Sequence, residues 1–379
     1  MYFKTMSLWS FNLIYLATFL LSCVIAYVAE KQSASRKWVL VFVAFLPLVL
    51  LAGLRDSAIG VDTDYYPLPY FHYSMNMNIL DMMKEAGCEP GFSALFWAIS
   101  RITRSFNAVL TVIQLLMVLP LVWTLYKLKI NSIIPAVLVY ACTFFPWSLN
   151  IMRQSLAASI LLISFVLAFE GKPRWYLVSS LICVSVHLTG ILSFAIWPVF
   201  QWSKLDDTKR NRAGLVIVFT VLFAIGFSLV FGEQLLGALS HLKESYKVQL
   251  EEMGTGDINV FVTVFPVLCS LLMILSSTRN SEVEIFDQKV ISALILISAV
   301  AAELSLLSIL SMSLARIGQM CLIFCPIIAS VANDVLNGFN RGKLFVWLVM
   351  AFSLLLFLWV YCYGDAAGII PYRMANPLL

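Results

Sequence analysis

Long apolar runs recur along the whole chain, and they constrain its fold more than any other feature. About 20 apolar residues in an α-helix cross roughly 30 Å of hydrocarbon. The 379 residues are 61% hydrophobic and only 12% charged, which lies well outside the composition of a soluble domain. The sequence therefore predicts an all-α, polytopic integral membrane protein that forms one transmembrane domain over residues 1–379.

We expect about 12 transmembrane or half-spanning helices, the first of them retained in the membrane rather than cleaved as a signal peptide. The run from Trp175 to Gln201 is too long for one crossing and short for two, and both its flanks are basic. Two half-spans that meet at His187 would satisfy both facts. The expected spans are 8–28, 38–54, 107–126, 132–149, 154–169, 175–187, 189–201, 213–231, 258–277, 290–310, 317–333 and 343–363.

The distribution of basic residues predicts the orientation. Six loops hold 15 of the 25 Lys and Arg residues, and the positive-inside rule places such loops in the cytoplasm. Both termini then face outward, as do the long loops 55–106 and 232–257. We expect an interfacial or re-entrant helix at 91–103 and an amphipathic helix near 235–250 on this outer face. The basic loops are 29–37, 127–130, 171–174, 203–212, 278–289 and 334–343.

Several charged side chains stand at the outer ends of apolar runs. Hydrocarbon penalises an ionised side chain by roughly 2.5–3.5 kcal/mol at a helix centre, so charges near it usually serve a pathway or a reaction. A cluster of cations on one face predicts the handling of an anion, and a guanidinium suits phosphate oxygens. An arginine that snorkels to lipid headgroups is the simpler alternative. The residues concerned are Arg55, Arg153, Arg316, His187 and Glu89.

Polar neighbours strengthen the interpretation as a pocket. Asn150, Arg153 and Gln154 are spaced i, i+3, i+4, which would place all three on one helical face. Glu303, inside the span 290–310, is expected to be a buried counter-ion for one of the arginines. His187 could accept a proton from a sugar hydroxyl, and a structural imidazole at a helix break is an equal alternative.

Asp62-Thr-Asp64 followed by Tyr65 and Tyr66 favours a carbohydrate contact, because carboxylates accept bonds from hydroxyls and aromatic rings cover apolar sugar faces. The same tripeptide could hold a divalent metal against a diphosphate, but it is common by chance. The eight cysteines lie mostly within apolar runs and indicate small buried side chains rather than disulfides. We expect no metal, no cofactor and no nucleic-acid partner.

Six short motifs, in this order, resemble the EpsG-type exopolysaccharide polymerases, which are relatives of the Wzy O-antigen polymerases. They span the chain from Gly53 to Arg373. The motifs are Gly53-Leu-Arg55 with Gly60-Val-Asp62-Thr-Asp64-Tyr65, then Glu89-Pro-Gly-Phe92, Met152-Arg153-Gln154-Ser-Leu-Ala157, Val186-His187-Leu-Thr-Gly190, Ala315-Arg316-Ile317 and Ile370-Pro371-Tyr372-Arg373.

The resemblance implies a GT-C-like, inverting glycan polymerase of the bacterial inner membrane, active on its outer, periplasmic or extracellular, face. Undecaprenyl-diphosphate-linked oligosaccharides would be both donor and acceptor, and a separate protein that regulates chain length would be a partner. Motif matches suggest Arg55, Arg153 and Arg316 for the diphosphate, Glu89 or His187 as the base, and Asp62, Asp64, Tyr65 and Gln154 for the sugar. The alternatives are an O-antigen ligase-like transferase, a lipid-linked oligosaccharide flippase or other transporter and, less favoured, a membrane acyltransferase.

Overall fold

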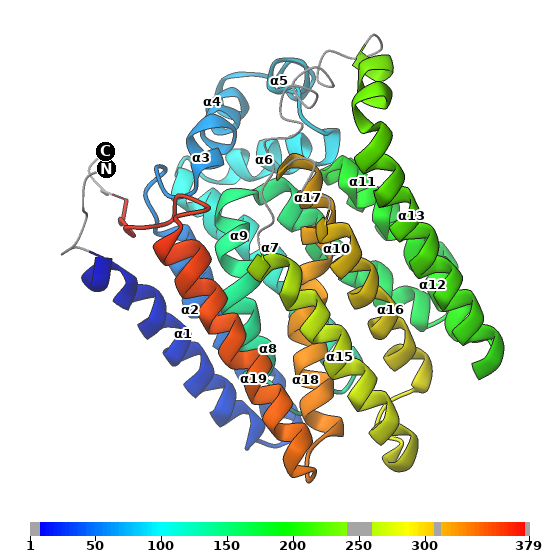
Figure 1. Cartoon of the computed structure of the whole chain (residues 1–379). Helices are drawn as coiled ribbons and strands as arrows, with labels where there is room; N and C mark the ends of the chain where they lie inside the picture. The colour runs from blue at the N-terminus through cyan, green and yellow to red at the C-terminus, as the bar shows by residue number, and fades with distance from the viewer. Residues whose placement is uncertain (1–7, 241–259, 307–311, 376–379) are drawn as a thin grey trace.

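The protein is a bundle of helices in a computed structural model that describes residues 8–240, 260–306 and 312–375 (Figure 1). Within these ranges no β-strand forms, and one isolated bridge pairs Arg55 with Met374. The all-α membrane fold predicted from the apolar runs is confirmed.

Among the described residues, eight segments are long and apolar enough to cross a membrane, and each coincides with an expected span. The segments around Arg153 and Arg316 lie deepest in the bundle: 72% and 83% of their residues are buried, against 28% for the first helix. The eight are α1 (Leu8–Glu30), α2 (Ala34–Gly53), α7 (Phe106–Lys127), α10 (Met152–Phe169), α15 (Val260–Val283), α16 (Gln288–Ser305), the continuous run α17 (Met312–Gln319), η4 (Met320–Phe324) and α18 (Cys325–Val335), and α19 (Asn340–Leu356) with η5 (Phe357–Tyr363).

Two other expected spans depart from a simple helix. The segment 132–149 becomes α8 (Ile134–Val139), the π-helical turn η1 (Tyr140–Phe144) and α9 (Phe145–Asn150). The segment 213–231 lies inside α13 (Asp207–Ser240), which continues through the start of the expected outer loop. The remainder of the amphipathic helix expected near 235–250 lies outside the described residues.

The run after Lys172 forms two antiparallel half-spans, as the sequence predicts. Gly171 has φ of +68°, which ends α10, and Pro173 then starts α11 (Pro173–Val186). His187 is extended, with φ −158° and ψ 139°, and the chain returns through η2 (Leu188–Ala195) and α12 (Ile196–Ser203). A Cβ on Gly190 would lie 2.4 Å from the carbonyl oxygen of Cys183, so the two halves approach too closely for any other residue.

The basic loops meet at one end of the bundle. Lys37 Nζ donates to the carbonyl of Ile130 over 3.1 Å, and Lys127 pairs with Glu170 over 2.6 Å. Asp334 accepts bonds from the backbone N–H groups of residues 131 and 132. These contacts tie loops that are far apart in sequence and confirm that the basic loops share one end.

Four short helices gather at the opposite end (Figure 1). The last of them, α6, corresponds to the interfacial helix expected at 91–103 and packs against α4, α5, α7 and α11. The start of α1 and the end of η5 also lie at this end (Figure 1). The four helices are α3 (Val61–Tyr65), α4 (Pro67–Asn76), α5 (Ile79–Ala86) and α6 (Pro90–Ile102).

Candidate functional site

A polar pocket of about 80 Å³ lies at the end of the bundle that carries α3 to α6. It is formed where α3, the α9–α10 junction, the His187 vertex and α17 come together. Segments more than 250 residues apart in the chain therefore contribute to one small site. Its lining residues are Asp62, Tyr66, Pro67, Asn150, Ile151, Met152, Arg153, His187 and Arg316.

A break between two helices shapes the pocket floor. Ile151 has φ −98° and ψ 67°, so α9 ends at Asn150 and α10 starts afresh at Met152. The prediction that Asn150, Arg153 and Gln154 share one helical face is wrong, because the non-helical Ile151 leaves Asn150 on α9 and the other two on α10, although Asn150 and Arg153 still line the same pocket. Asn150 Oδ1 instead accepts a bond of 2.8 Å from the backbone N–H of Asp62 and so fixes the start of α3.

Arg153 has its guanidinium held from two sides. Its Nη1 donates to Oε2 of Glu89 over 2.9 Å. The rings of Tyr66 and Tyr70 lie 5.5 and 5.8 Å from its Cζ, within cation–π range. The ion pair is only partly buried, with side chains 25% and 23% exposed, so both groups stay accessible to a ligand in the pocket.

Glu89 is placed by the N-terminus of α6 and by the half-span vertex. It precedes Pro90, the first residue of α6. Its Oε1 accepts a bond of 3.2 Å from the backbone N–H of Leu188 and lies 3.9 Å from Nε2 of His187. A Cβ on Gly91 would come within 2.3 Å of Ser185 Oγ, which shows how closely α6 docks on α11. This contact holds Glu89 beside His187.

The hydrogen bonds of His187 determine which ring nitrogen carries the proton. Nδ1 accepts the backbone N–H of Thr189 over 3.2 Å and lies 2.7 Å from the Thr189 hydroxyl. The neutral ring therefore carries its hydrogen on Nε2, which faces Glu89. Burial lowers the pKa of His187 below its ordinary 6.5; Glu89 opposes this shift, and Arg153 and Arg316 reinforce it. His187 is neutral at pH 7.

Asp62 and Arg316 complete the pocket from opposite walls. Burial raises the pKa of Asp62 above its ordinary value, against the opposing effect of Arg316 and then Arg153. In the part of the chain that the structure describes, no carboxylate lies within salt-bridge distance of Arg316. A Cβ on Gly318 would meet the Ser305 backbone nitrogen at 2.8 Å, so α17 fits closely against α16 and sets the position of Arg316.

A family model matches residues 38–374, nearly the whole chain, and its description is the EpsG family. The chain belongs to the EpsG family. No curated protein and no solved structure matches it. Membership confirms the resemblance seen in the six motifs and indicates a multi-pass membrane protein of the exopolysaccharide polymerase type.

Three of the six EpsG-like motifs place Arg153, His187 and Arg316 in the pocket lining, and a fourth places Glu89 beside Arg153. The first motif contributes Asp62 to the lining but not its arginine. The Arg55 guanidinium is 1% exposed and donates from Nη1 to the carbonyl of Ala52 and from Nη2 to the carbonyl of Leu149. It does not line the pocket. The segments around the first and last motifs instead bond to each other. Asp56 donates its N–H to the Arg373 carbonyl, and the Tyr372 hydroxyl donates to the Leu51 carbonyl.

Besides Arg55 and Glu89, three other predicted site residues lie outside the pocket lining. Tyr65 is 72% exposed, and Asp64, beside it on α3, is exposed as well. Gln154 is buried and donates to the backbone carbonyl of Arg316, so it positions α17. Glu303 forms no ion pair with a described arginine, and its Oε2 has no hydrogen-bond partner among the described residues, so the expectation of a counter-ion is wrong.

Of the two tyrosines expected at a carbohydrate contact, Tyr66 lines the pocket and Tyr65 does not. Sequence reasoning missed the role of Thr189, whose N–H and hydroxyl lie at Nδ1 of His187. Thr189 follows His187 by two residues within a quoted motif, and this proximity was the available signal.

Proposed function

We propose that this EpsG protein is a membrane glycosyltransferase that joins undecaprenyl-diphosphate-linked oligosaccharide units into an O-antigen or exopolysaccharide. The observation that carries the proposal is the gathering of two guanidinium groups, one carboxylate and an imidazole in one pocket, with the carboxylate of Glu89 bonded to Arg153 beside it. The pocket lies at the end opposite the basic loops, and the positive-inside rule turns that end outward. The reaction would take place on the outer face of the bacterial inner membrane.

Arg316 and Arg153 would hold the diphosphate of the donor. Negative charge develops on this leaving group as the anomeric bond breaks, and preformed cationic donors stabilise such charge. Arg316 has no described carboxylate partner and is the stronger candidate. Arg153 is paired with Glu89 in the absence of substrate, so an incoming phosphate oxygen can share its guanidinium fork.

Glu89 is the better of the two candidate bases. A base must present an unprotonated atom to the acceptor hydroxyl, and Nδ1 of His187 is occupied by Thr189 while its Nε2 carries hydrogen. The acceptor oxygen would attack the anomeric carbon and pass its proton to Glu89. The bond from that carbon to the phosphate oxygen breaks, and its electron pair leaves with the diphosphate. Configuration at the carbon is inverted.

His187 and Asp62 would support the two sides of this reaction. The Nε2–H of His187 faces Glu89 and can orient its carboxylate or donate to the substrate. Asp62 lines the same pocket and can accept a bond from a sugar hydroxyl, as the sequence suggested. In its neutral form His187 brings no further charge into the pocket.

The placement of the charges favours an enzyme over a carrier. A carrier needs its binding groups near the bilayer midplane, where both faces can reach them in turn. The pocket instead lies at helix ends, beside α3 and α6. A ligase-like transferase would use the same donor with a different acceptor, so the choice of acceptor in the assay separates it from a polymerase. A chain-length regulator is a further expected partner.

The test is polymerisation of the native lipid-linked repeat unit by purified protein in nanodiscs. Arg316→Ala should lower the rate by about 100-fold to 1,000-fold, as loss of one donor to a developing charge does elsewhere. Arg373→Ala is the matched control, because it removes an exposed cation from the same end without touching the pocket. Equal rates in the two variants would remove Arg316 from the mechanism, and an inactive wild-type protein would refute the polymerase.

A further inference from the structure

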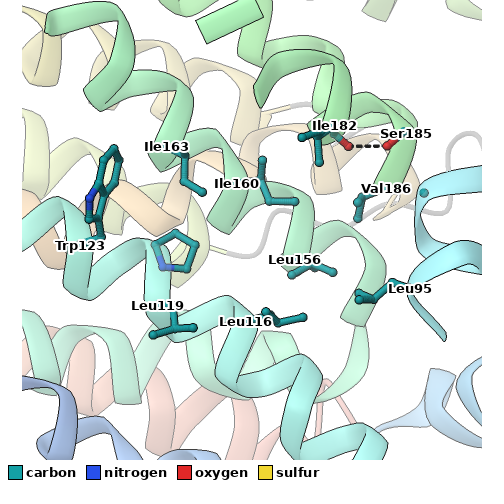
Figure 2. A pocket seen from close by; sticks show the side chains of 12 residues that line it. Leu95, Leu116, Leu119, Trp123, Leu156, Ile160, Ile163, Ile182, Ser185 and Val186 are labelled. Atoms are coloured by element: carbon teal, nitrogen blue, oxygen red, sulfur yellow. Dashed lines mark hydrogen bonds between the residues drawn. The ribbon is translucent and has the colours of Figure 1, made fainter. Parts of the chain in front are cut away.

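A second and larger cavity runs down the side of the bundle next to the polar pocket. It has a volume of about 640 Å³, within the range of roughly 300–1,000 Å³ that ligand pockets occupy. Figure 2 shows the side chains of α7, α10 and α11 that face one another around it. We name this cavity the lateral groove. Its lining is Gly91, Leu95, Leu116, Leu119, Pro120, Trp123, Leu156, Ile160, Ile163, Ile182, Ser185 and Val186.

The groove wall offers nothing to a polar ligand. Apart from Gly91 and Ser185, every lining residue is apolar. The Ser185 hydroxyl already donates to the carbonyl of Ile182 over 2.7 Å, as the dashed line in Figure 2 marks. Leu119 and Ile182 remain 42% and 49% exposed, so the groove opens sideways, toward the space that lipid would fill. An aliphatic chain is the ligand that suits such a wall.

The lateral groove begins where the polar pocket ends. Two of its lining residues are close chain neighbours of residues that line the pocket, and a third, Gly91, follows Glu89, the ion-pair partner of Arg153, by two residues. Val186 directly precedes His187. Leu156 lies three residues, or about 4.5 Å along the helix, after Arg153. From there Ile160 and Ile163 continue the wall along α10. The groove extends about 10 Å along α10, from Leu156 to Ile163.

We infer that the lateral groove binds the polyprenyl tail of the donor, next to its diphosphate. This inference rests on the proposed function. A donor whose diphosphate is held by Arg153 and Arg316 must place its first isoprene units within a few ångströms of that site. The acceptor reacts at a sugar hydroxyl, so its own diphosphate and tail are separated from the pocket by the length of the repeat unit. Only the donor tail can enter a groove that starts at Glu89 and Arg153.

Photolabelling tests occupancy without requiring activity. The probe is undecaprenyl diphosphate with a diazirine on the isoprene unit nearest the phosphate. Labelling should fall on lining residues of α7, α10 and α11, and unlabelled undecaprenyl diphosphate should compete with it. Phosphatidylglycerol at the same concentration should not compete. Labelling outside the groove, or competition by phosphatidylglycerol, would mean that an ordinary acyl chain fills the groove and would overturn the inference.

A substitution that fills the groove tests its role in transfer. Ile182→Trp places a large ring in the mouth of the groove, and Leu181→Trp places the same ring on the neighbouring exposed position, which does not line it. Two pairs of substrates distinguish binding of the donor tail from binding of the acceptor tail. In each pair the donor has its reactive sugar hydroxyl blocked, so it cannot act as acceptor. The acceptor carries a phosphonate in place of the diphosphate linkage, so it cannot act as glycosyl donor. One pair has a full-length donor tail and a geranyl acceptor tail; the other pair reverses the lengths.

Ile182→Trp should slow the pair with the full-length donor by about tenfold or more, since the bound tail loses its apolar contact area. It should leave the pair with the geranyl donor unchanged, and Leu181→Trp should affect neither. Slowing of the second pair alone would assign the groove to the acceptor and overturn the inference. Equal rates for both tryptophan variants would also overturn the inference. Arg316→Ala tests the proposed function separately, because it should slow the reaction of both substrate pairs.

Discussion

Arg55 and Arg316 stand at the same end of the bundle and come from equally short motifs, yet their surroundings differ. Arg55 is 1% exposed, and its two Nη groups donate to carbonyls at the ends of α2 and α9. Arg316 lines the polar pocket, and no described carboxylate pairs with it. A guanidinium whose Nη groups donate to backbone carbonyls holds helices together, whereas one that lines a pocket and pairs with no described carboxylate can bind an anion.

The two regions are linked through the α9–α10 junction. The carbonyl of Leu149 accepts from Arg55 and from the Thr63 hydroxyl, and the next residue, Asn150, anchors Asp62. Gly60, with φ of +88°, allows α3 to approach this carbonyl, because a Cβ there would lie 2.3 Å from it. Arg55 therefore supports the pocket from behind without entering it.

The largest effect should come from the pocket side of this comparison. Glu89→Gln keeps the shape of the side chain and its bond to Leu188 but removes the proton acceptor. We expect the polymerisation rate to fall by about 100-fold to 10,000-fold, the contribution typical of a general base. The measurement is the initial rate of dimer formation with purified protein. Glu85→Gln, on the neighbouring helix α5 and outside the pocket, is the control. A Glu89→Gln protein with normal activity would exclude Glu89 as the base.

Arg55→Ala should change stability more than catalysis. Removing the side chain takes a donor away from the buried carbonyls of Ala52 and Leu149 and opens a cavity, which we expect to lower the free energy of unfolding by roughly 2–5 kcal/mol. Thermal unfolding in detergent measures this, with the exposed Arg36→Ala on the same helix α2 as control. The KM of the folded fraction for donor should stay near that of wild type. Normal stability with a raised KM would instead support the diphosphate role suggested by the sequence.

The spans could be predicted because burial in lipid demands long apolar helices, and that demand is visible residue by residue. Even the vertex at His187 followed from a run too long for one crossing and short for two. The basic loops also share one end, as the positive-inside rule requires. Each of these properties depends on local composition, which a single sequence contains.

The choice between a buried and an available arginine could not be predicted, because it depends on contacts between distant segments. The sequence does not show that Leu149 would direct its carbonyl at Arg55, or that the C-terminal segment would pair with residues 54–56. The break at Ile151 was also hidden, since an apolar residue there fits a continuous helix as well. Tertiary contacts decide these cases.

Tyr65 and Tyr66 allow a finer test of the same distinction. The ring of Tyr66 lies 5.5 Å from Arg153 Cζ, whereas Tyr65 is 72% exposed and does not line the pocket. Tyr66→Leu should lower the apparent affinity for donor by about 2-fold to 5-fold, as loss of a partly exposed cation–π contact predicts. Tyr66→Phe should be near wild type. Titration of undecaprenyl diphosphate binding measures the effect, and a greater loss in Tyr65→Leu would favour the sugar contact expected from the sequence.

The smallest effect we expect is a change in pH dependence. Burial lowers the pKa of His187 below its ordinary 6.5, with Glu89 opposing and the two pocket arginines reinforcing the shift. Protonation of His187 would place a cation 3.9 Å from Glu89 and engage its carboxylate in an ion pair. Activity should therefore be constant above pH 6.5 and fall as the pH drops through the lowered pKa. The neutral folded form also binds fewer protons than the unfolded chain. The contribution of neutral His187 to the free energy of unfolding is therefore fully present above pH 6.5 and is lost as the pH falls through the lowered pKa.

His187→Asn keeps an acceptor for the Thr189 N–H but cannot be protonated. Its rate should be lower than that of wild type by less than about tenfold at pH 7, and its acidic decline should begin at lower pH, where only the carboxylates titrate. Rates and thermal midpoints measured from pH 5 to 8 check both statements. His72→Asn, an exposed histidine on α4, should retain the wild-type profile. If His187→Asn and wild type decline together, the acidic limb belongs to a carboxylate, and the half-span vertex contributes geometry to the pocket rather than a titrating group.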